Sequence, residues 1–97
     1  MTNRKTIQES VCRIAPRYKI VRASLFGSYA RDEQTDSSDV DVLIDTDSGF
    51  TLLDAISFEN ELEDTLSCSV DVVSRRALTG SFRDQVLSEE LTLYARA

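Results

Sequence analysis

Three aspartates in two apolar segments are the residues best suited to chemistry. Asp39 and Asp41 lie two residues apart in SDVDVLID, and Asp71 lies among valines in SVDVVS. Residues i and i+2 of a strand point to the same face, so Asp39 and Asp41 would present two carboxylates side by side. Such charges repel unless a cation lies between them, and carboxylate oxygens suit Mg²⁺. If the two strands are neighbours, all three carboxylates converge on a divalent-metal site.

A second polar group precedes the aspartates, where an apolar run ends at Gly27-Ser28. A strand that gives way there to a short helix would turn backbone N–H groups and a hydroxyl towards an anion. Gly27 permits close approach of the backbone, and Ser28 can cap the helix and hold a phosphate. Arg31, one helical turn later, could reach the same anion. An anion cradle beside a cation site is what phosphoryl or nucleotidyl transfer requires.

Other interpretations of an Asp-x-Asp pair fit this sequence less well. In haloacid-dehalogenase phosphatases the aspartates follow an apolar strand, whereas here they begin one. Glycosyltransferase Asp-x-Asp pairs lie in much larger domains. The remaining acids around this segment are expected to be solvated, and they are Asp32, Glu33, Asp36, Asp45 and Asp47.

Composition excludes several classes of function. The chain has no histidine, which removes Ser-His-Asp, Cys-His and histidine-based nuclease chemistry. Its net charge of −6 opposes stable binding to nucleic acid by this chain alone. Cys12 and Cys68 are far apart without a zinc pattern, so both are expected to be reduced and partly in the core. No apolar run approaches the roughly 20 residues of a membrane helix, and a cytoplasmic protein without membrane contacts is expected.

Hydrophobic periodicity divides the chain into alternating helices and strands. The first helix is expected to open with a capping box at Thr6 to Glu9 and to end near Pro16. Strands are expected where β-branched and aromatic residues cluster, and the last segment, LTLYA, is expected to be extended. The predicted order is strand 20–26, short helix 28–33, loop 34–38, strand 40–44, turn 46–49, helix from 51, strand 70–73 and helix from 80.

The two later helices carry apolar residues that are predicted to face the core. This alternation of elements favours an α/β (α+β) fold in which a small mixed central sheet is flanked by helices. At 97 residues, the whole chain, 1–97, is expected to form a single domain. The residues expected to point inward are Leu53, Ile56, Leu62 and Leu66 in one helix and Phe82, Val86 and Leu87 in the other.

Gly27-Ser28, ten further residues and then Asp39-Val40-Asp41 resemble the GSx10DxD signature of the DNA polymerase β nucleotidyltransferase superfamily. The wider string GSYAR…SSDVDVLID is similar to its minimal members, the MNT proteins (MntA-like antitoxins) encoded beside HEPN toxins. The similarity covers essentially the whole chain, and SVDVV matches the third acidic strand. The resemblance implies a polymerase-β-like nucleotidyltransferase fold.

The resemblance also implies how ATP would be held. Gly27 and Ser28 would bind the terminal phosphates, with Arg31 assisting, and Ser38 is expected to contact the nucleotide as well. One position departs from the family pattern, because Asp32 follows Arg31 where the family commonly has glycine. If that position requires positive φ, aspartate tolerates it better than most residues. Its charge would weaken binding of the phosphates.

By the same resemblance, the three aspartates carry the catalysis. Asp39 and Asp41 would bind two Mg²⁺ ions, and Asp71 would ligate the catalytic metal and help deprotonate an incoming hydroxyl. The ions would stabilise charge on the α-phosphate and on the leaving pyrophosphate. The implied enzyme is a protein adenylyltransferase of EC 2.7.7 type.

The implied function is that of an antitoxin, which transfers AMP from ATP to a tyrosine of its cognate HEPN ribonuclease toxin. The lack of histidine agrees with this chain not being the ribonuclease. Two alternatives stay open: an antitoxin that neutralises its toxin only by binding it, and a transferase that acts on a small molecule such as an antibiotic. A free edge of the sheet or the segment LTLYARA is a candidate partner surface.

Overall fold

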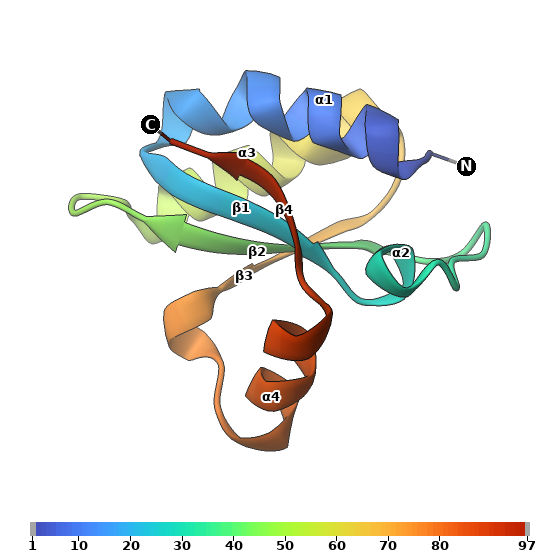
Figure 1. The fold of residues 1–97 in the computed structure, drawn as a ribbon. Helices are drawn as coiled ribbons and strands as arrows, with labels where there is room; N and C mark the ends of the chain where they lie inside the picture. The colour runs from blue at the N-terminus through green and yellow to red at the C-terminus, as the bar shows by residue number, and fades with distance from the viewer. Residues whose placement is uncertain (1, 97) are drawn as a thin grey trace.

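The computed structural model describes residues 2–96, which form a four-stranded sheet with helices on both faces (Figure 1). This arrangement confirms the predicted fold class. In chain order the elements are α1 (Arg4–Ile14), η1 (Ala15–Tyr18), β1 (Ile20–Phe26), α2 (Ser28–Arg31), β2 (Val40–Thr46), α3 (Leu52–Leu66), β3 (Val70–Ser74), η2 (Arg75–Ala77), α4 (Gly80–Glu89) and β4 (Leu91–Ala95).

The sheet is mixed, with the strand order β3-β2-β1-β4. β1 is antiparallel to both β2 and β4, whereas β2 and β3 are parallel and joined by the crossover helix α3. The predicted extended segment LTLYA is therefore β4, at one edge of the sheet. In the register of the parallel pair Asp41 lies beside Asp71, and on its other side Asp41 lies beside Phe26 of β1. The two acidic strands are thus neighbours, as the converging-carboxylate prediction requires.

Both faces of the sheet are covered, but unequally. α1 and α3 lie over one face and form the main core with the side chains of Val40, Val42 and Ile44 (Figure 1). On the opposite face a smaller core joins Leu43 to Val86 of α4. Burial on both faces explains why β2 is apolar over most of its length rather than strictly alternating.

The helix ends follow side-chain caps, and one of them differs from the prediction. α1 begins at Arg4 because the side chain of Asn3, not Thr6, caps it: Asn3 Oδ1 accepts a hydrogen bond of 2.9 Å from the N–H of Thr6. Thr6 therefore lies inside the first turn. α3 begins directly after Thr51, in agreement with the predicted helix from 51, and Thr51 and Asp54 are bonded reciprocally in a capping box. α1 gives way to the 3₁₀ turn η1 next to Pro16, as predicted.

The predicted inward faces of α3 and α4 are partly wrong. Leu53 is 74% exposed and Ile56 is 46% exposed. Phe58, Leu62 and Leu66 are buried and four residues apart, so they define the inner face of α3. At about 100° per residue, Ile56 lies roughly 160° around the helix from Phe58.

In α4, Val86 is buried and Leu87 partly buried, as predicted, but Phe82 is 51% exposed. Its ring meets Phe26 edge-on at a centroid distance of 6.3 Å, so it borders the small core rather than filling it. Both cysteines are free, and of the two only Cys68 is partly buried, since Cys12 is exposed. No helix within residues 2–96 combines the length and apolar character needed to cross a membrane.

The β3 edge of the sheet has backbone donors that are already bonded. The N–H of Val70 donates to Glu63 Oε2, and the N–H of Val72 donates to Glu59 Oε1, both at 3.0 Å. Both glutamates come from α3, which packs along this strand. Two N–H groups that would otherwise be free to pair with another strand are thereby satisfied within the chain.

Candidate active site

The three aspartates come from neighbouring positions at one end of the β2–β3 pair. Asp39 immediately precedes β2, and Asp41 and Asp71 lie side by side in the parallel register. Asp41 shares its face of the sheet with Leu43, two residues later, which packs towards α4. Asp41 is half-buried, whereas Asp39 and Asp71 are exposed. The structure therefore places the three carboxylates at one end of this strand pair, as the sequence indicated.

The environment of Asp41 disfavours its charge. Burial, followed by the nearby charges of Asp71 and Asp39, raises the pKa of Asp41 from its ordinary 3.8 to about 6. Arg31 opposes this rise in pKa and Glu89 adds to it. A divalent cation would relieve the repulsion, and carboxylate oxygens are the ligands that Mg²⁺ prefers. The donor set therefore fits a hard cation.

The carboxylates do not form a finished cage. Among the side chains of residues 2–96, no three acidic, thiol or imidazole groups lie close enough to hold one ion jointly. Because Asp39 and Asp71 are exposed, rotation of their side chains can bring them towards Asp41 without disturbing the core. The site is thus one half-buried carboxylate flanked by two exposed ones.

Gly27 packs directly against Asp41. Its backbone has φ 75° and ψ −154°, in the left-handed half of the map where glycine is favoured. A Cβ built at this position would lie 2.1 Å from Asp41 Oδ2, far inside contact distance. Glycine is therefore required twice, for its conformation and for the close approach of the carboxylate. The predicted anion cradle and the aspartate pair are parts of one site.

The short helix α2 follows Gly27 and is held by contacts from both ends of the chain. The N–H groups of Ala30 and Arg31 donate to the carbonyl of Gly27, which closes the turn. Arg4, at the start of α1, donates to the carbonyls of Tyr29 at 2.8 Å and Ala30 at 2.9 Å. No local motif marks Arg4 as a residue that positions this site, because its partners lie 25 and 26 residues away.

Asp32 ends α2 in the left-handed conformation, with φ 61° and ψ 36°. This is the positive φ that a glycine at this position would adopt, and aspartate is among the residues that tolerate it. The side chain of Asp32 is exposed. The backbone geometry of the turn is thus preserved despite the departure from the family pattern.

Arg31 and Gly27 are both bonded to a residue that the sequence did not indicate, Glu89. Glu89 Oε1 accepts from the N–H of Gly27 at 2.9 Å, and both carboxylate oxygens accept from Arg31 Nη1, at 3.1 and 3.0 Å. Arg31 Nε donates to Glu33 at 3.0 Å. Hydrogen bonds to Glu33 and Glu89 raise the pKa of Arg31 above its ordinary value. Arg31 therefore lies beside the cradle, as predicted, with acidic partners from two segments.

At the other end of β2, Asp45 was expected to be solvated, and that prediction is wrong. Arg75 Nε donates to Asp45 Oδ1 at 2.8 Å, and the two terminal nitrogens of Arg75 donate to Glu90 at 2.8 and 2.7 Å. Glu90 also accepts from Arg22, at 3.2 Å. These bonds, above all those from Arg75, lower the pKa of Glu90. Asp45 is thus part of a structural ion-pair cluster; Asp47 is exposed, as are Asp32, Glu33 and Asp36, in agreement with the prediction.

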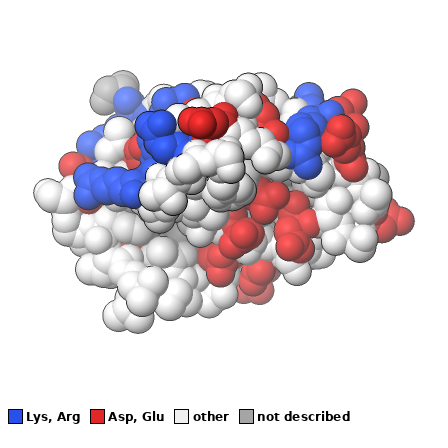
Figure 2. Space-filling model, turned by 90° about the horizontal axis from the view of Figure 1, so that it is seen from below, with Lys and Arg blue, Asp and Glu red and all other residues white. Residues whose placement is uncertain are grey.

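Charge is unevenly spread on the face that carries α4. Figure 2 looks onto this face and shows acidic side chains gathered near its middle, with Lys and Arg mostly to either side. Asp41 lies on this side of the sheet together with Glu89 at the end of α4. An acidic patch of this kind attracts cations and repels free phosphates unless cations accompany them.

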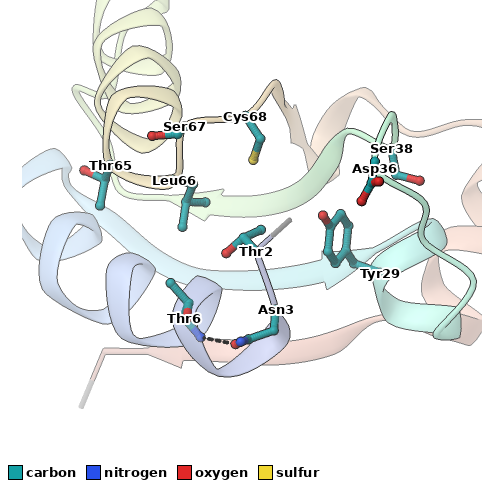
Figure 3. A pocket seen from close by; sticks show the side chains of 10 residues that line it. All are labelled: Thr2, Asn3, Thr6, Tyr29, Asp36, Ser38, Thr65, Leu66, Ser67 and Cys68. Atoms are coloured by element: carbon teal, nitrogen blue, oxygen red, sulfur yellow. Dashed lines mark hydrogen bonds between the residues drawn. The ribbon is translucent and has the colours of Figure 1, made fainter.

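A cavity of about 400 Å³ lies on the other side of the sheet, between the start of α1 and the end of α3 (Figure 3). Tyr29, Asp36 and Ser38 line it. The three site aspartates, Asp39, Asp41 and Asp71, do not. Burial raises the pKa of Tyr29. Ser38 Oγ accepts a hydrogen bond from the N–H of Thr35 at 2.8 Å. The expected contact of Ser38 with the nucleotide stays a prediction.

The sequence matches the family described as "Polymerase beta, Nucleotidyltransferase" over residues 9–97. A relative from Methanocaldococcus jannaschii, named "Putative protein adenylyltransferase", is 37% identical over 87 residues, which are 90% of this chain and 94% of the relative. The protein adenylyltransferase MntA of Thermococcus cleftensis is 37% identical over 73 residues, which are 75% of this chain and 74% of that protein.

Solved structures share the fold. One described as a "putative minimal nucleotidyltransferase" is 39% identical, has a TM-score of 0.80 and covers 90% of this chain and 89% of its own. A complex of a tri-AMPylated HEPN toxin with an MNT antitoxin from Shewanella oneidensis matches with a TM-score of 0.72 and 18% identity, covering 95% of this chain and 72% of that chain. At this lower identity the likeness concerns the fold alone.

Proposed function

The chain belongs to the polymerase beta nucleotidyltransferase family, and we propose that it transfers AMP from ATP to a protein acceptor. Relatives of similar length are named protein adenylyltransferases. The observation that carries the proposal is Asp41, a carboxylate crowded by Asp39 and Asp71 and packed against Gly27. Such crowding of like charges destabilises the folded protein on its own. It is expected at a site that binds the cations accompanying a triphosphate.

Each residue of the site has a role in this reaction. Asp39 and Asp41 would hold two Mg²⁺ ions, which when bound neutralise charge on the α-phosphate and the leaving pyrophosphate. The Gly27 N–H, Ser28 and Arg31 would bind the terminal phosphates. Asp71 would take the proton of the acceptor hydroxyl, whose oxygen forms a bond to the α-phosphorus.

The bond between the α-phosphorus and the bridging oxygen breaks in the same step, and pyrophosphate leaves with that oxygen. The acceptor retains AMP as a phosphodiester, so atoms and charge balance without a further reactant. The site residues orient the reacting groups and hold one proton, as is usual for phosphoryl-type transfer.

The acceptor in this proposal is a tyrosine of a cognate HEPN toxin, and its modification neutralises the toxin. Two facts support a HEPN toxin as the acceptor protein: an MNT antitoxin of the same fold has been solved in complex with a tri-AMPylated HEPN toxin, and a relative that is 37% identical is named protein adenylyltransferase MntA. The chain's net charge of −6 disfavours a nucleic-acid acceptor.

The test is to incubate the chain with its cognate HEPN protein, ATP and Mg²⁺ and to weigh the HEPN protein intact. Addition of AMP is expected with the unaltered chain, and its loss is expected in EDTA or with Asp41→Asn. Asp45→Asn is the matched control, because it removes the same charge from the same strand outside the site. Absence of an adduct, under conditions in which ATP binds, would contradict the proposal.

A second function, neutralisation by binding alone, is favoured by one observation. Arg31 and the Gly27 N–H are already bonded to Glu89, so this part of the cradle has internal partners. Toxin that is neutralised equally well by Asp41→Asn, without AMP on the toxin, would establish this function. Loss of neutralisation together with the adduct would exclude it.

A further inference from the structure

The carboxylate of Glu89 is bonded to the same two groups that the proposed function assigns to the terminal phosphates of ATP. Oε1 accepts from the N–H of Gly27 at 2.9 Å and from Arg31 Nη1 at 3.1 Å, and Oε2 accepts from Arg31 Nη1 at 3.0 Å. The Glu89 side chain is only 13% exposed. It is a mostly buried anion on the predicted anion-binding groups.

These contacts are of the kind that a bound phosphate would make. Carboxylate and phosphate oxygens both accept charge-assisted hydrogen bonds from backbone N–H groups and from guanidinium. The Gly27 N–H has a single proton, so a phosphate oxygen and Glu89 compete for it. Nucleotide bound in the proposed way therefore requires that Glu89 first leave.

Departure of Glu89 would relieve repulsion at the site and leave the end of α4 held by other contacts. Its charge lies close enough to contribute to the repulsion at Asp41. The next residue, Glu90, has its own partners, because Arg75 and Arg22 hold it. The end of α4 therefore stays anchored while the Glu89 side chain rotates away.

We propose that Glu89 is an internal substitute for the terminal phosphate, which keeps the Gly27 N–H and Arg31 in their binding geometry and is displaced when the nucleotide enters. The inference rests on the proposed function, since that function places the triphosphate at Gly27. Its consequence is that the unaltered chain binds nucleotide more weakly than its own site permits, and that rotation of Glu89 accompanies binding.

The test measures the affinity for Mg·ATP and for inorganic tripolyphosphate by calorimetry in the unaltered chain and in Glu89→Gln. The variant is nearly isosteric but lacks the charge, so both ligands are expected to bind about fivefold more tightly. Glu33→Gln is the matched control: it also removes one negative charge from a partner of Arg31, but Glu33 does not touch Gly27. Its affinities are expected to change less than about twofold.

A second measurement follows the displacement itself and does not depend on activity. The chain has three glycines, Gly27, Gly49 and Gly80, so ¹⁵N-glycine labelling gives three backbone signals for them. Glu89→Gln is expected to shift the Gly27 signal and to leave the other two in place, which also shows that the variant is folded. Tripolyphosphate with Mg²⁺ is expected to move the Gly27 signal of the unaltered chain as well.

The outcomes separate this inference from the proposed function. If the unaltered chain binds Mg·ATP and Glu89→Gln binds it equally or more weakly, Glu89 is not a competitor and the inference is overturned, while the proposed function stands. If neither protein binds Mg·ATP or shifts the Gly27 signal, both fail. Tighter binding by Glu89→Gln, beyond that of Glu33→Gln, supports the inference.

Discussion

The two ends of β2 place an aspartate side chain in opposite electrostatic environments. Asp41 and Asp45 are four residues apart on one strand, and both are partly buried. Asp41 has two further acids beside it and a pKa raised to about 6. Asp45 is paired with Arg75, which also holds Glu90. One end of the strand concentrates negative charge, and the other end balances it.

This difference separates a structural carboxylate, Asp45, from one that is proposed to be functional, Asp41. A partly buried ion pair such as Asp45–Arg75 connects two elements and requires nothing from outside the chain. A partly buried carboxylate among like charges, such as Asp41, makes the protein less stable by itself, and a bound cation would compensate it. We expect substitutions at the Asp41 end of β2 to change mainly activity and substitutions at the Asp45 end to change mainly stability.

The largest expected contrast is in catalysis. Asp41→Asn should lower AMP transfer about a thousandfold, because charge stabilisation by bound metal is worth several kcal/mol. Asp45→Asn should change the rate less than about threefold, since Asp45 is bonded to Arg75 and not to the site. The measurement is the initial rate of adduct formation on the toxin by intact mass. Equal losses in both variants would erase the distinction between the two ends.

The next contrast is in stability. Arg75→Ala should lower the free energy of unfolding by about 3 kcal/mol, because it leaves Glu90 and Asp45 without their main partner. The neighbouring Arg76 is exposed and serves as the control. Arg76→Ala should cost less than about 0.5 kcal/mol. Urea denaturation of both variants measures the difference, and a small effect of Arg75→Ala would show that the cluster is not structural.

A smaller contrast isolates the contact between Gly27 and Asp41. Gly27→Ala should cost about 3 kcal/mol, because it combines a strained φ with a collision with Asp41 Oδ2. Gly80 also has positive φ, but a Cβ there meets no atom within 4 Å. Gly80→Ala should therefore cost only about 1 kcal/mol. Thermal or urea denaturation gives the difference; equal costs would mean that Asp41 moves aside freely.

The smallest expected effect is in the pH dependence of stability without metal. Because the folded chain binds the Asp41 proton more tightly than the unfolded chain does, the free energy of unfolding should fall as pH rises from about 5 to about 7. The change should be about 1 kcal/mol, since partial exposure screens the charges. Urea denaturation in EDTA measures it, and Asp41→Asn should flatten the slope.

Glu90 contributes a pH dependence of the free energy of unfolding that has the opposite sign. Its pKa is lowered from an ordinary 4.5, so its stabilising contribution is complete above that pH and is lost only as pH falls further. Above about pH 5.5 it contributes almost no slope to the free energy of unfolding. A slope in that range that persists in Asp41→Asn would have to come from another group.

The sequence predicted the placement of the candidate site residues better than that of the residues that support them. Gly27, Asp39, Asp41 and Asp71 lie within or next to strands, and the two-residue period of a strand is enough to place them on one face. The sequence alone could not establish that the strand SVDVV lies beside β2, because strand pairing joins segments that are far apart in the chain. Asp32 was correctly judged able to adopt positive φ.

The residues that support the candidate site and the opposite end of β2 could not be found in this way. Arg4, Arg75 and Glu89 reach their partners across 15 to 62 residues of chain, and no local pattern records such contacts. The error in α3 has a similar origin. Leu53 and Ile56 were assigned to a stripe from their apolar character, although Phe58 sets the buried face of that helix.

The glutamates on the β3 edge affect how this small protein behaves at high concentration. A strand at the edge of a sheet can recruit identical strands from other molecules and grow into fibrils. Here Glu59 and Glu63 occupy the donors of Val72 and Val70, and they add two negative charges that repel another copy. A partner that docks on this chain is therefore expected to contact its side chains rather than extend the sheet at β3, and the same two residues disfavour pairing of β3 with another copy.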